Sequence, residues 1–163
     1  MLGPPVSAGV RGLVKRTFGT WPIRLLRGGV TLTDAEYHLV CLLIAELPPH
    51  LRETVESQFE AYNLVQREID KRTFNFYRAR PWFSGLLPVT PLLKSKLEVA
   101  PLVRLSARVI GENAPLHAVL TSVNSRAFSV SFNRVVSPGS RPGDYTIEKV
   151  TQAWLSNFDE EAE

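Results

Sequence analysis

The fold is decided by three consecutive stretches, LEVAPLVRLSARVI (97–110), LHAVLTSVN (116–124) and AFSVSFNRVV (127–136). Apolar and polar residues alternate along each of them, which is the period of a β-strand with one buried face and not the period of a helix. In the first stretch, Arg104 and Arg108 fall on the face opposite the apolar residues. In the third, Phe128, Val130 and Phe132 are predicted to share one face. The short turns between the stretches predict neighbouring antiparallel strands.

Two helices are predicted ahead of these strands, over residues 34–46 and 49–62. Thr33 followed by Glu36 forms a capping box at the start of the first helix. A proline pair separates the two helices, and proline is tolerated in the first turn of the second. The apolar residues of the second helix recur at the spacing of a buried stripe. Its opposite face carries three carboxylates, Glu53, Glu56 and Glu60.

A hairpin over residues 63–69 and 73–78 and a third helix over residues 146–157 complete the predicted elements. The order ααβββββα predicts an α+β fold, with an antiparallel five-stranded meander sheet and helices packed on one face. A chain of 163 residues fits a single domain. Within it we expect a basic N-terminal arm over 1–32, an α+β core over 33–158 and an acidic tail over 159–163.

Two segments allow more than one interpretation. The N-terminal arm is rich in arginine and free of acidic residues. It is either an irregular segment packed on the domain or an organellar transit peptide. Residues 81–96 contain three prolines, which exclude a helix interior or a central strand. The same loop carries Trp82 and Phe83, and it either caps the core or contacts a partner.

Catalytic and metal chemistry have little support in the sequence. Cys41 lies in an apolar helical run and is interpreted as a core residue. As the single cysteine it excludes an internal disulfide and fits a reducing compartment. The three histidines, His38, His50 and His117, lack the spacing of metal ligands, and no nucleophile motif is present. We therefore expect a non-enzymatic protein without a cofactor or metal. No apolar run is long enough to cross a bilayer, so no membrane insertion is expected.

Charge is segregated along the chain, although the net charge is only +3. Residues 1–33 are purely basic, residues 34–62 mostly acidic and residues 63–136 mostly basic. This pattern predicts surfaces of opposite potential, which steer a charged partner. It also suggests an alternative function, a nucleic-acid-binding accessory protein using the basic hairpin and sheet. Phe74 and Phe76 lie among these basic residues, but at the parity of a buried sheet face.

Three segments carry a family resemblance: TLTDAEYHLVCLLIAELPP, YNLVQREIDKRTFNFYR and PLHAVLTSVNSRAFSVSFNR. Together they resemble the immunity proteins of bacterial polymorphic toxin systems, in particular those of contact-dependent growth inhibition. The resemblance implies a cytoplasmic protein that binds a cognate toxin domain in a 1:1 complex and blocks it. The candidate contacts are the helix carboxylates Glu53, Glu56 and Glu60, the sheet arginines Arg104, Arg108 and Arg126, and the loop residues Trp82 and Phe83.

The basic net charge departs from one pattern within that family. Immunity proteins against nucleases are frequently acidic, because they occupy a basic nucleic-acid cleft. Two expectations remain open for this chain. Either the acidic face of its second helix blocks the toxin, or the toxin is not a basic nuclease.

Overall fold

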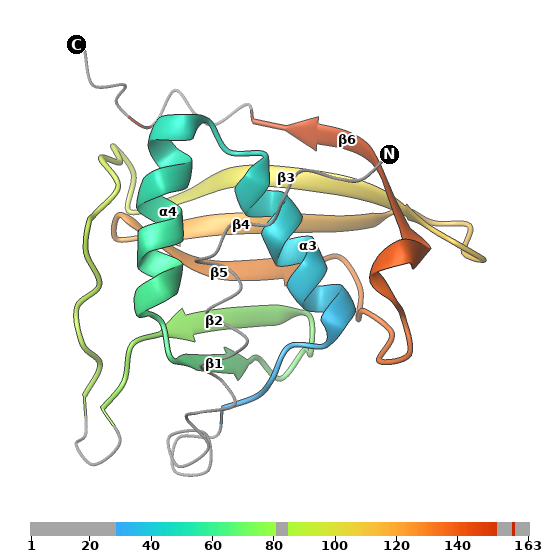
Figure 1. The fold of residues 1–163 in the computed structure, drawn as a ribbon, viewed down its shortest axis with the longest axis horizontal. Coiled ribbons are helices and arrows are strands. Elements are labelled where there is room, and N and C mark those ends of the chain that lie inside the picture. Colours follow the sequence, from blue (N-terminus) through green and yellow to red (C-terminus); the bar gives the residue numbers. More distant parts are fainter. Residues whose placement is uncertain (1–28, 81–84, 153–157, 159–163) are drawn as a thin grey trace.

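The computed structural model describes residues 29–80, 85–152 and Phe158. Within them the chain forms an α+β fold in which helices and strands pack as two layers (Figure 1). None of the described helices is long and apolar enough to cross a membrane. The elements are α3 (Asp34–Ala45), α4 (Pro49–Ala61), β1 (Leu64–Arg67), β2 (Thr73–Tyr77), β3 (Val99–Val109), β4 (Leu116–Val123), β5 (Arg126–Phe132), a short 3-10 turn, η1 (Pro142–Asp144), and β6 (Tyr145–Thr151).

The strands form one antiparallel sheet in the order β1-β2-β5-β4-β3-β6. Both helices lie on the same face of this sheet (Figure 1), as predicted. The prediction of a five-stranded meander is wrong, since the sheet has six strands and β2 pairs with β5 rather than with β3. The reason is the long segment between β2 and β3. Because of its length, β3 does not have to lie beside β2. The strands β3, β4 and β5 form a meander whose last strand, β5, pairs with β2.

The third predicted helix is a strand over the residues that the structure describes there. Residues 145–151 form β6, which pairs with β3, and residues 153–157 lie outside the described part of the chain. The register shifts so that Ala107 pairs with Ile147 while Ser106 pairs with Lys149. One extra residue is thereby accommodated, and Ile147 and Val150 both pack on the core although they are three apart. Apolar residues three apart are also typical of a helix, which is why the sequence predicted a helix here.

A second bulge corrects the predicted parity of β5. Thr121 pairs with Ser129 and Ser122 with Ala127, so Phe128 is the extra residue. Val130 and Phe132 are buried as predicted. Phe128 is instead half-buried, and its ring packs edge-to-face on the ring of Tyr77, with 5.1 Å between centroids.

The capping box at the start of α3 is confirmed. The Glu36 N–H donates to Thr33 Oγ1 over 3.3 Å, and Glu36 Oε2 accepts from the Thr33 N–H over 2.8 Å. The Glu36 carboxylate is only 1 % exposed and also pairs with Arg67 of β1, at 3.0 Å from Nη1 to Oε1. The Arg67 guanidinium lies over the Phe74 ring at 4.3 Å. One carboxylate therefore starts α3 and joins it to the sheet.

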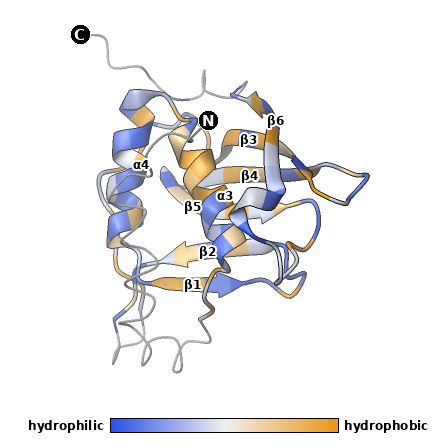
Figure 2. Cartoon of the chain, turned by 45° about the vertical axis from the view of Figure 1, so that its right-hand side comes forward, coloured by the Kyte–Doolittle hydropathy of each residue, from blue (hydrophilic) through white to orange (hydrophobic). Residues whose placement is uncertain are grey.

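The core lies between the helices and the sheet. It is built from the buried faces of α3 and α4 and from the alternating apolar residues of β3, β4 and β5. Figure 2 shows this division, with apolar colours on α3 and the strands and hydrophilic colours along much of α4. The end of the predicted N-terminal arm joins the fold, because the Val30 N–H donates to the Val65 carbonyl over 2.8 Å. The rest of that arm and the acidic tail lie outside the described residues.

The turn between β4 and β5 provides a stability prediction. Asn124 and Ser125 adopt φ angles of 49° and 63° between the paired residues Val123 and Arg126. Two positive φ angles define the hairpin turn that favours Asn-Gly, because a side chain costs free energy in this region. We expect Ser125→Gly to stabilise the protein by about 1 kcal/mol and to raise Tm by roughly 2–4 °C. Thermal unfolding checks this, and an unchanged or lower Tm would contradict the turn geometry.

Candidate functional site

The outer face of α4 is an acidic stripe. Glu53 and Glu60 are exposed and Glu56 is half-buried, while Leu51 and Val55 on the opposite side of the helix are buried in the core. The predicted division of this helix into an apolar and an acidic face is confirmed. The three carboxylates therefore point away from the sheet, on the helix layer of the molecule.

Two polar side chains fix α4 to the start of β5. The Ala127 N–H donates to Gln58 Oε1 over 2.8 Å, and the Tyr62 hydroxyl donates to the Ala127 carbonyl over 2.5 Å. Pairing between β2 and β5 stops at Asn75 and Ser129, so the Ala127 backbone has no partner on β2. The Gln58 and Tyr62 side chains provide its hydrogen bonds instead. Gln58 is fully buried and also donates to the Pro91 carbonyl over 2.5 Å. The helix that carries the acidic stripe is thus bonded to the sheet and to the loop before β3.

The start of α4 is joined to the end of α3 by a further side chain. The Arg52 guanidinium donates to the carbonyls of Ala45 and Leu47, the latter over 2.8 Å from Nη2. Ala45 ends α3 and Leu47 follows its C-cap, and at this end of a helix carbonyl acceptors lack partners within the helix and a cation is favourable. Both helices are therefore held in one orientation.

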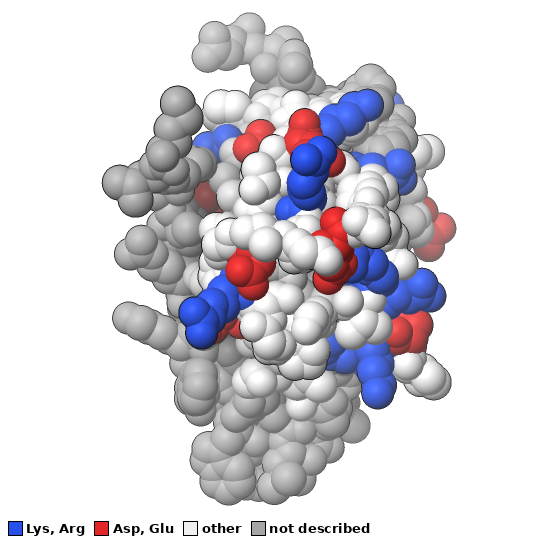
Figure 3. All heavy atoms as spheres, turned by 90° about the vertical axis from the view of Figure 1, so that its right-hand side faces the viewer, with Lys and Arg blue, Asp and Glu red and all other residues white. Residues whose placement is uncertain are grey.

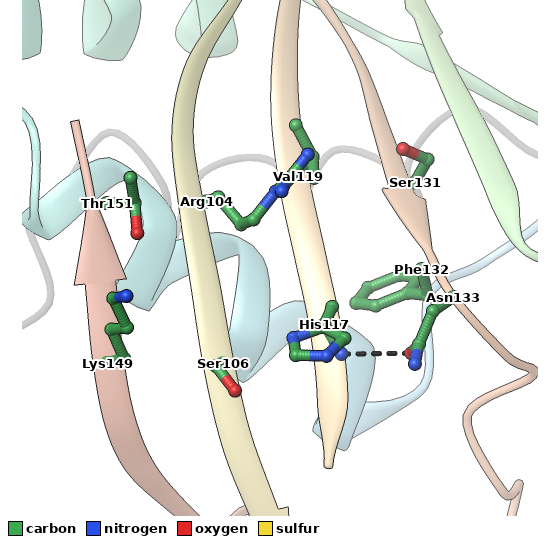
Figure 4. A pocket seen from close by; sticks show the side chains of 9 residues that line it. All are labelled: Arg104, Ser106, His117, Val119, Ser131, Phe132, Asn133, Lys149 and Thr151. Atoms are coloured by element: carbon green, nitrogen blue, oxygen red, sulfur yellow. Dashed lines mark hydrogen bonds between the residues drawn. The ribbon is translucent and has the colours of Figure 1, made fainter. Parts of the chain in front are cut away.

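The opposite face of the sheet carries a shallow hollow of about 510 Å³ (Figure 4). Its floor follows from the strand register, which places side chains of β6, β3, β4 and β5 in two rows. Figure 4 shows both rows with the helices behind the strands, and a hydrogen bond of 2.9 Å from the His117 N–H to Asn133 Oδ1. One row is Thr151, Arg104, Val119 and Ser131, and the other is Lys149, Ser106, His117 and Asn133.

No carboxylate lines this hollow among the residues that the structure describes. Its polar groups are the cations of Arg104 and Lys149, the imidazole of His117, an amide and three hydroxyls. Nitrogen and hydroxyl donors in this arrangement favour an anion. The hollow and the acidic stripe of α4 therefore present opposite charge on opposite layers of the molecule.

Of the other predicted contact residues that the structure describes, Arg108 and Arg126 do not line the hollow. Arg108 lies on the same strand as Arg104, is 74 % exposed and pairs with Glu148 of β6 at 2.6 Å. The Arg126 Nε–H donates to the Val89 carbonyl over 3.2 Å and so supports the loop before β3. Trp82 and Phe83 lie outside the described residues. The structure thus places Arg104, Arg108 and Arg126 in three different environments.

The sequence did not identify Lys149 as a member of the site. It was assigned to a helix, where it would share no row with Arg104 or His117. A signal was present, since Thr146, Ile147, Val150 and Thr151 are β-branched, and such residues favour strands. Read as a strand, residues 145–151 would have brought Lys149 to the face of Ser106.

The aromatic residues expected beside the basic groups are in the core. Phe74 is fully buried and Phe76 is 1 % exposed, so neither ring is available to stack on a base. Several basic groups are in ion pairs, as Arg134 with Glu112 and Arg108 with Glu148. Figure 3 shows acidic and basic side chains interspersed on the side of the molecule that it draws.

Two of the residues considered for chemistry, Cys41 and His38, lie on α3. Cys41 is 4 % exposed within α3. His38 of the same helix is half-buried, and burial lowers the pKa of its imidazole from the usual value. Over the described ranges, no group of three or more His, Cys, Asp and Glu side chains is arranged to hold a metal ion.

No protein-family model matches the chain, and comparisons with curated proteins and with solved structures gave no match.

The Tyr62 hydroxyl gives a pH-dependent prediction. Burial raises the pKa of this phenol well above its usual value, with Arg126 opposing the shift. The unfolded chain therefore ionises Tyr62 first, so the stability linked to this group is present below about pH 10 and is lost as the pH rises further. We expect Tyr62→Phe to cost about 1 kcal/mol at pH 7. The cost should shrink above about pH 10 in urea unfolding of both proteins. A cost that stays constant with pH would contradict the shift.

Proposed function

We propose that this chain is a non-enzymatic binding protein, an immunity protein that neutralises a cognate toxin domain in the cytoplasm through a 1:1 complex. The observation that supports this most is the acidic stripe on α4, carried by a helix that is bonded to the sheet. Glu53, Glu56 and Glu60 are then the contact residues, and the partner surface is basic. Two expectations were left open by the basic net charge of the chain. The proposal follows the first of them, in which the acidic face of α4 blocks the toxin.

The stripe itself costs stability. Glu53 and Glu56 are three residues apart and Glu56 and Glu60 are four apart, so they are neighbours on the helix surface. Like charges at these spacings destabilise a helix by a few tenths of a kcal/mol per pair. A basic partner surface removes this repulsion and replaces it with ion pairs. The arrangement is therefore more favourable in a complex than in the isolated chain.

The bracing of α4 favours tight association. Gln58, Tyr62 and Arg52 hold the helix against the sheet and against α3. A surface that is already ordered loses little conformational entropy on binding. Complementary charge in addition speeds the encounter with the partner. Both effects suit an inhibitor that must capture a toxin domain before it acts.

The experiment is a capture of the partner by the tagged full-length chain from its native host. The wild-type protein should retain a toxin domain at 1:1 stoichiometry and protect cells that express that domain. The variant E53K/E60K should lose both properties. A matched control, E98K/E148K, changes the net charge equally at exposed positions outside α4 and should keep both. Equal retention by the two variants would exclude the α4 stripe, and failure of the wild-type chain to protect cells would exclude the inhibitory role.

The alternative is a nucleic-acid-binding accessory protein. The basic hollow of the sheet face favours it, whereas the burial of Phe74 and Phe76 removes the stacking groups on which it partly rested. Phosphate contacts make binding steeply salt-dependent, by orders of magnitude between about 50 and 200 mM salt. Titration of generic oligonucleotides at low salt tests it, and absence of binding there would exclude it.

A further inference from the structure

We propose that the hollow on the sheet face is a binding site for a small organic phosphate with an apolar body. It lies on the layer opposite α4, so it is a second site and does not depend on the inhibitory role. Its volume of about 510 Å³ falls within the usual range of small-molecule sites.

The register places three nitrogen-bearing side chains at neighbouring positions of the hollow. Ser106 lies directly between Lys149 of β6 and His117 of β4 in one row of the sheet. Arg104, two residues before Ser106, lies diagonal to both Lys149 and His117. Diagonal neighbours on one face are about 7–8 Å apart, within reach of long side chains. Figure 4 shows the Arg104 side chain extended towards Val119, so donors from three adjacent strands can meet one ligand that spans both rows.

Arg104 and Lys149 place two cationic side chains on this face, and no carboxylate lines the hollow among the described residues. An anion bound there receives charge-assisted hydrogen bonds, which are about twice as strong as neutral ones.

The shape of the donor set indicates the kind of anion. Arg104, Lys149 and His117 approach from three directions, and the Ser106 hydroxyl adds a fourth donor. A phosphate monoester offers three oxygens and up to two negative charges, whereas a carboxylate offers two oxygens and one charge. The hollow also contains apolar surface, to which Val119 contributes its side chain. A phosphate attached to an apolar or aromatic body satisfies both parts of the site.

The test uses phenyl phosphate as the probe, with inorganic phosphate, phenol and benzoate as comparisons. Binding to the full-length chain is followed by the shifts of backbone amide resonances. Phenyl phosphate should shift the amides of Ser106, His117 and Ser131 and should bind more tightly than each of the other three. Shifts scattered over the surface would overturn the site. Benzoate binding as tightly as phenyl phosphate would overturn the assignment to a phosphate.

A matched pair of variants separates the hollow from general positive charge. Arg104→Gln should weaken phenyl phosphate binding about tenfold, because it removes a charge-assisted contact. Arg108→Gln removes the same charge from an exposed residue four positions along the same strand and should change binding by less than about twofold. Lys149→Gln provides a second variant and should resemble Arg104→Gln. Equal effects of the Arg104 and Arg108 substitutions would overturn the proposal.

Discussion

Replacing Glu36 by alanine is expected to destabilise the protein by about 3 kcal/mol. The carboxylate is 1 % exposed and makes two contacts with the Arg67 guanidinium, at 3.0 and 3.1 Å. Removal of one partner of a buried pair typically costs about 3–5 kcal/mol. Arg67 retains some access to water, with a side chain 22 % exposed, which places the expected loss at the lower end. The substitution also leaves the Thr33 N–H without its acceptor.

Asp34 provides the control for this prediction. It lies in the same first turn of α3 and carries the same charge, but it is exposed. Asp34→Ala is expected to cost less than about 1 kcal/mol, since only a helix-dipole contribution is lost. The drop in Tm for Glu36→Ala should be roughly 6–12 °C for a chain of this size. Similar losses for both variants would show that Glu36 contributes only its charge at the helix start.

Replacing Gln58 by alanine is expected to cost about 3 kcal/mol. The fully buried amide accepts from the Ala127 N–H and donates to the carbonyls of Pro91 and Ser125. Each buried backbone group left without a partner costs about 1–3 kcal/mol. The loop before β3 should also loosen, because the Leu93 N–H donates to the same Ser125 carbonyl over 2.7 Å. Denaturant unfolding measures the first effect and hydrogen exchange at Leu93 the second.

Ser57 is the matched position for this experiment. It precedes Gln58 on α4 and is half-buried. Ser57→Ala is expected to change stability by less than about 0.5 kcal/mol and to leave exchange at Leu93 unchanged. If Gln58→Ala were no more harmful than Ser57→Ala, the bonds between α4 and the sheet would not be what fixes this helix.

Much of the fold follows from local patterns in the sequence. The capping box at Thr33 and Glu36 and the period of two in β3 and β4 each specify an element without reference to the rest of the chain. Strand pairing over long distances is different. Nothing local to β2 indicates that its partner is β5, because that choice depends on where the long segment after β2 leads the chain.

The two errors of parity share one physical cause. The bulges at Phe128 and beside Ile147 each insert an extra residue into a strand. A bulge shifts the side chains beyond it to the opposite face, so a strict alternation fails for Phe128. In β6 the same insertion puts Ile147 and Val150 on one face and imitates a helical spacing. The basic hollow of the sheet face takes Lys149 from this strand, so the sequence indicated only its other cation, Arg104.

The acidic stripe was fully visible in the sequence. The apolar residues of α4 define its inner side, and the helical period then fixes Glu53, Glu56 and Glu60 on the outer side. The structure adds the side chains that brace the helix, Gln58, Tyr62 and Arg52. Their partners lie on other elements, so no pattern within the helix itself revealed them.

The most direct test of the proposed function is the rate at which the chain associates with its captured toxin domain. We expect E53K/E60K to slow association by about tenfold or more at 50 mM salt, with a smaller difference at 500 mM, because salt screens exposed charges. R104E/K149E on the opposite layer should associate as fast as the wild-type chain. The opposite result, normal association of E53K/E60K and slow association of R104E/K149E, would contradict the account and assign partner binding to the sheet face.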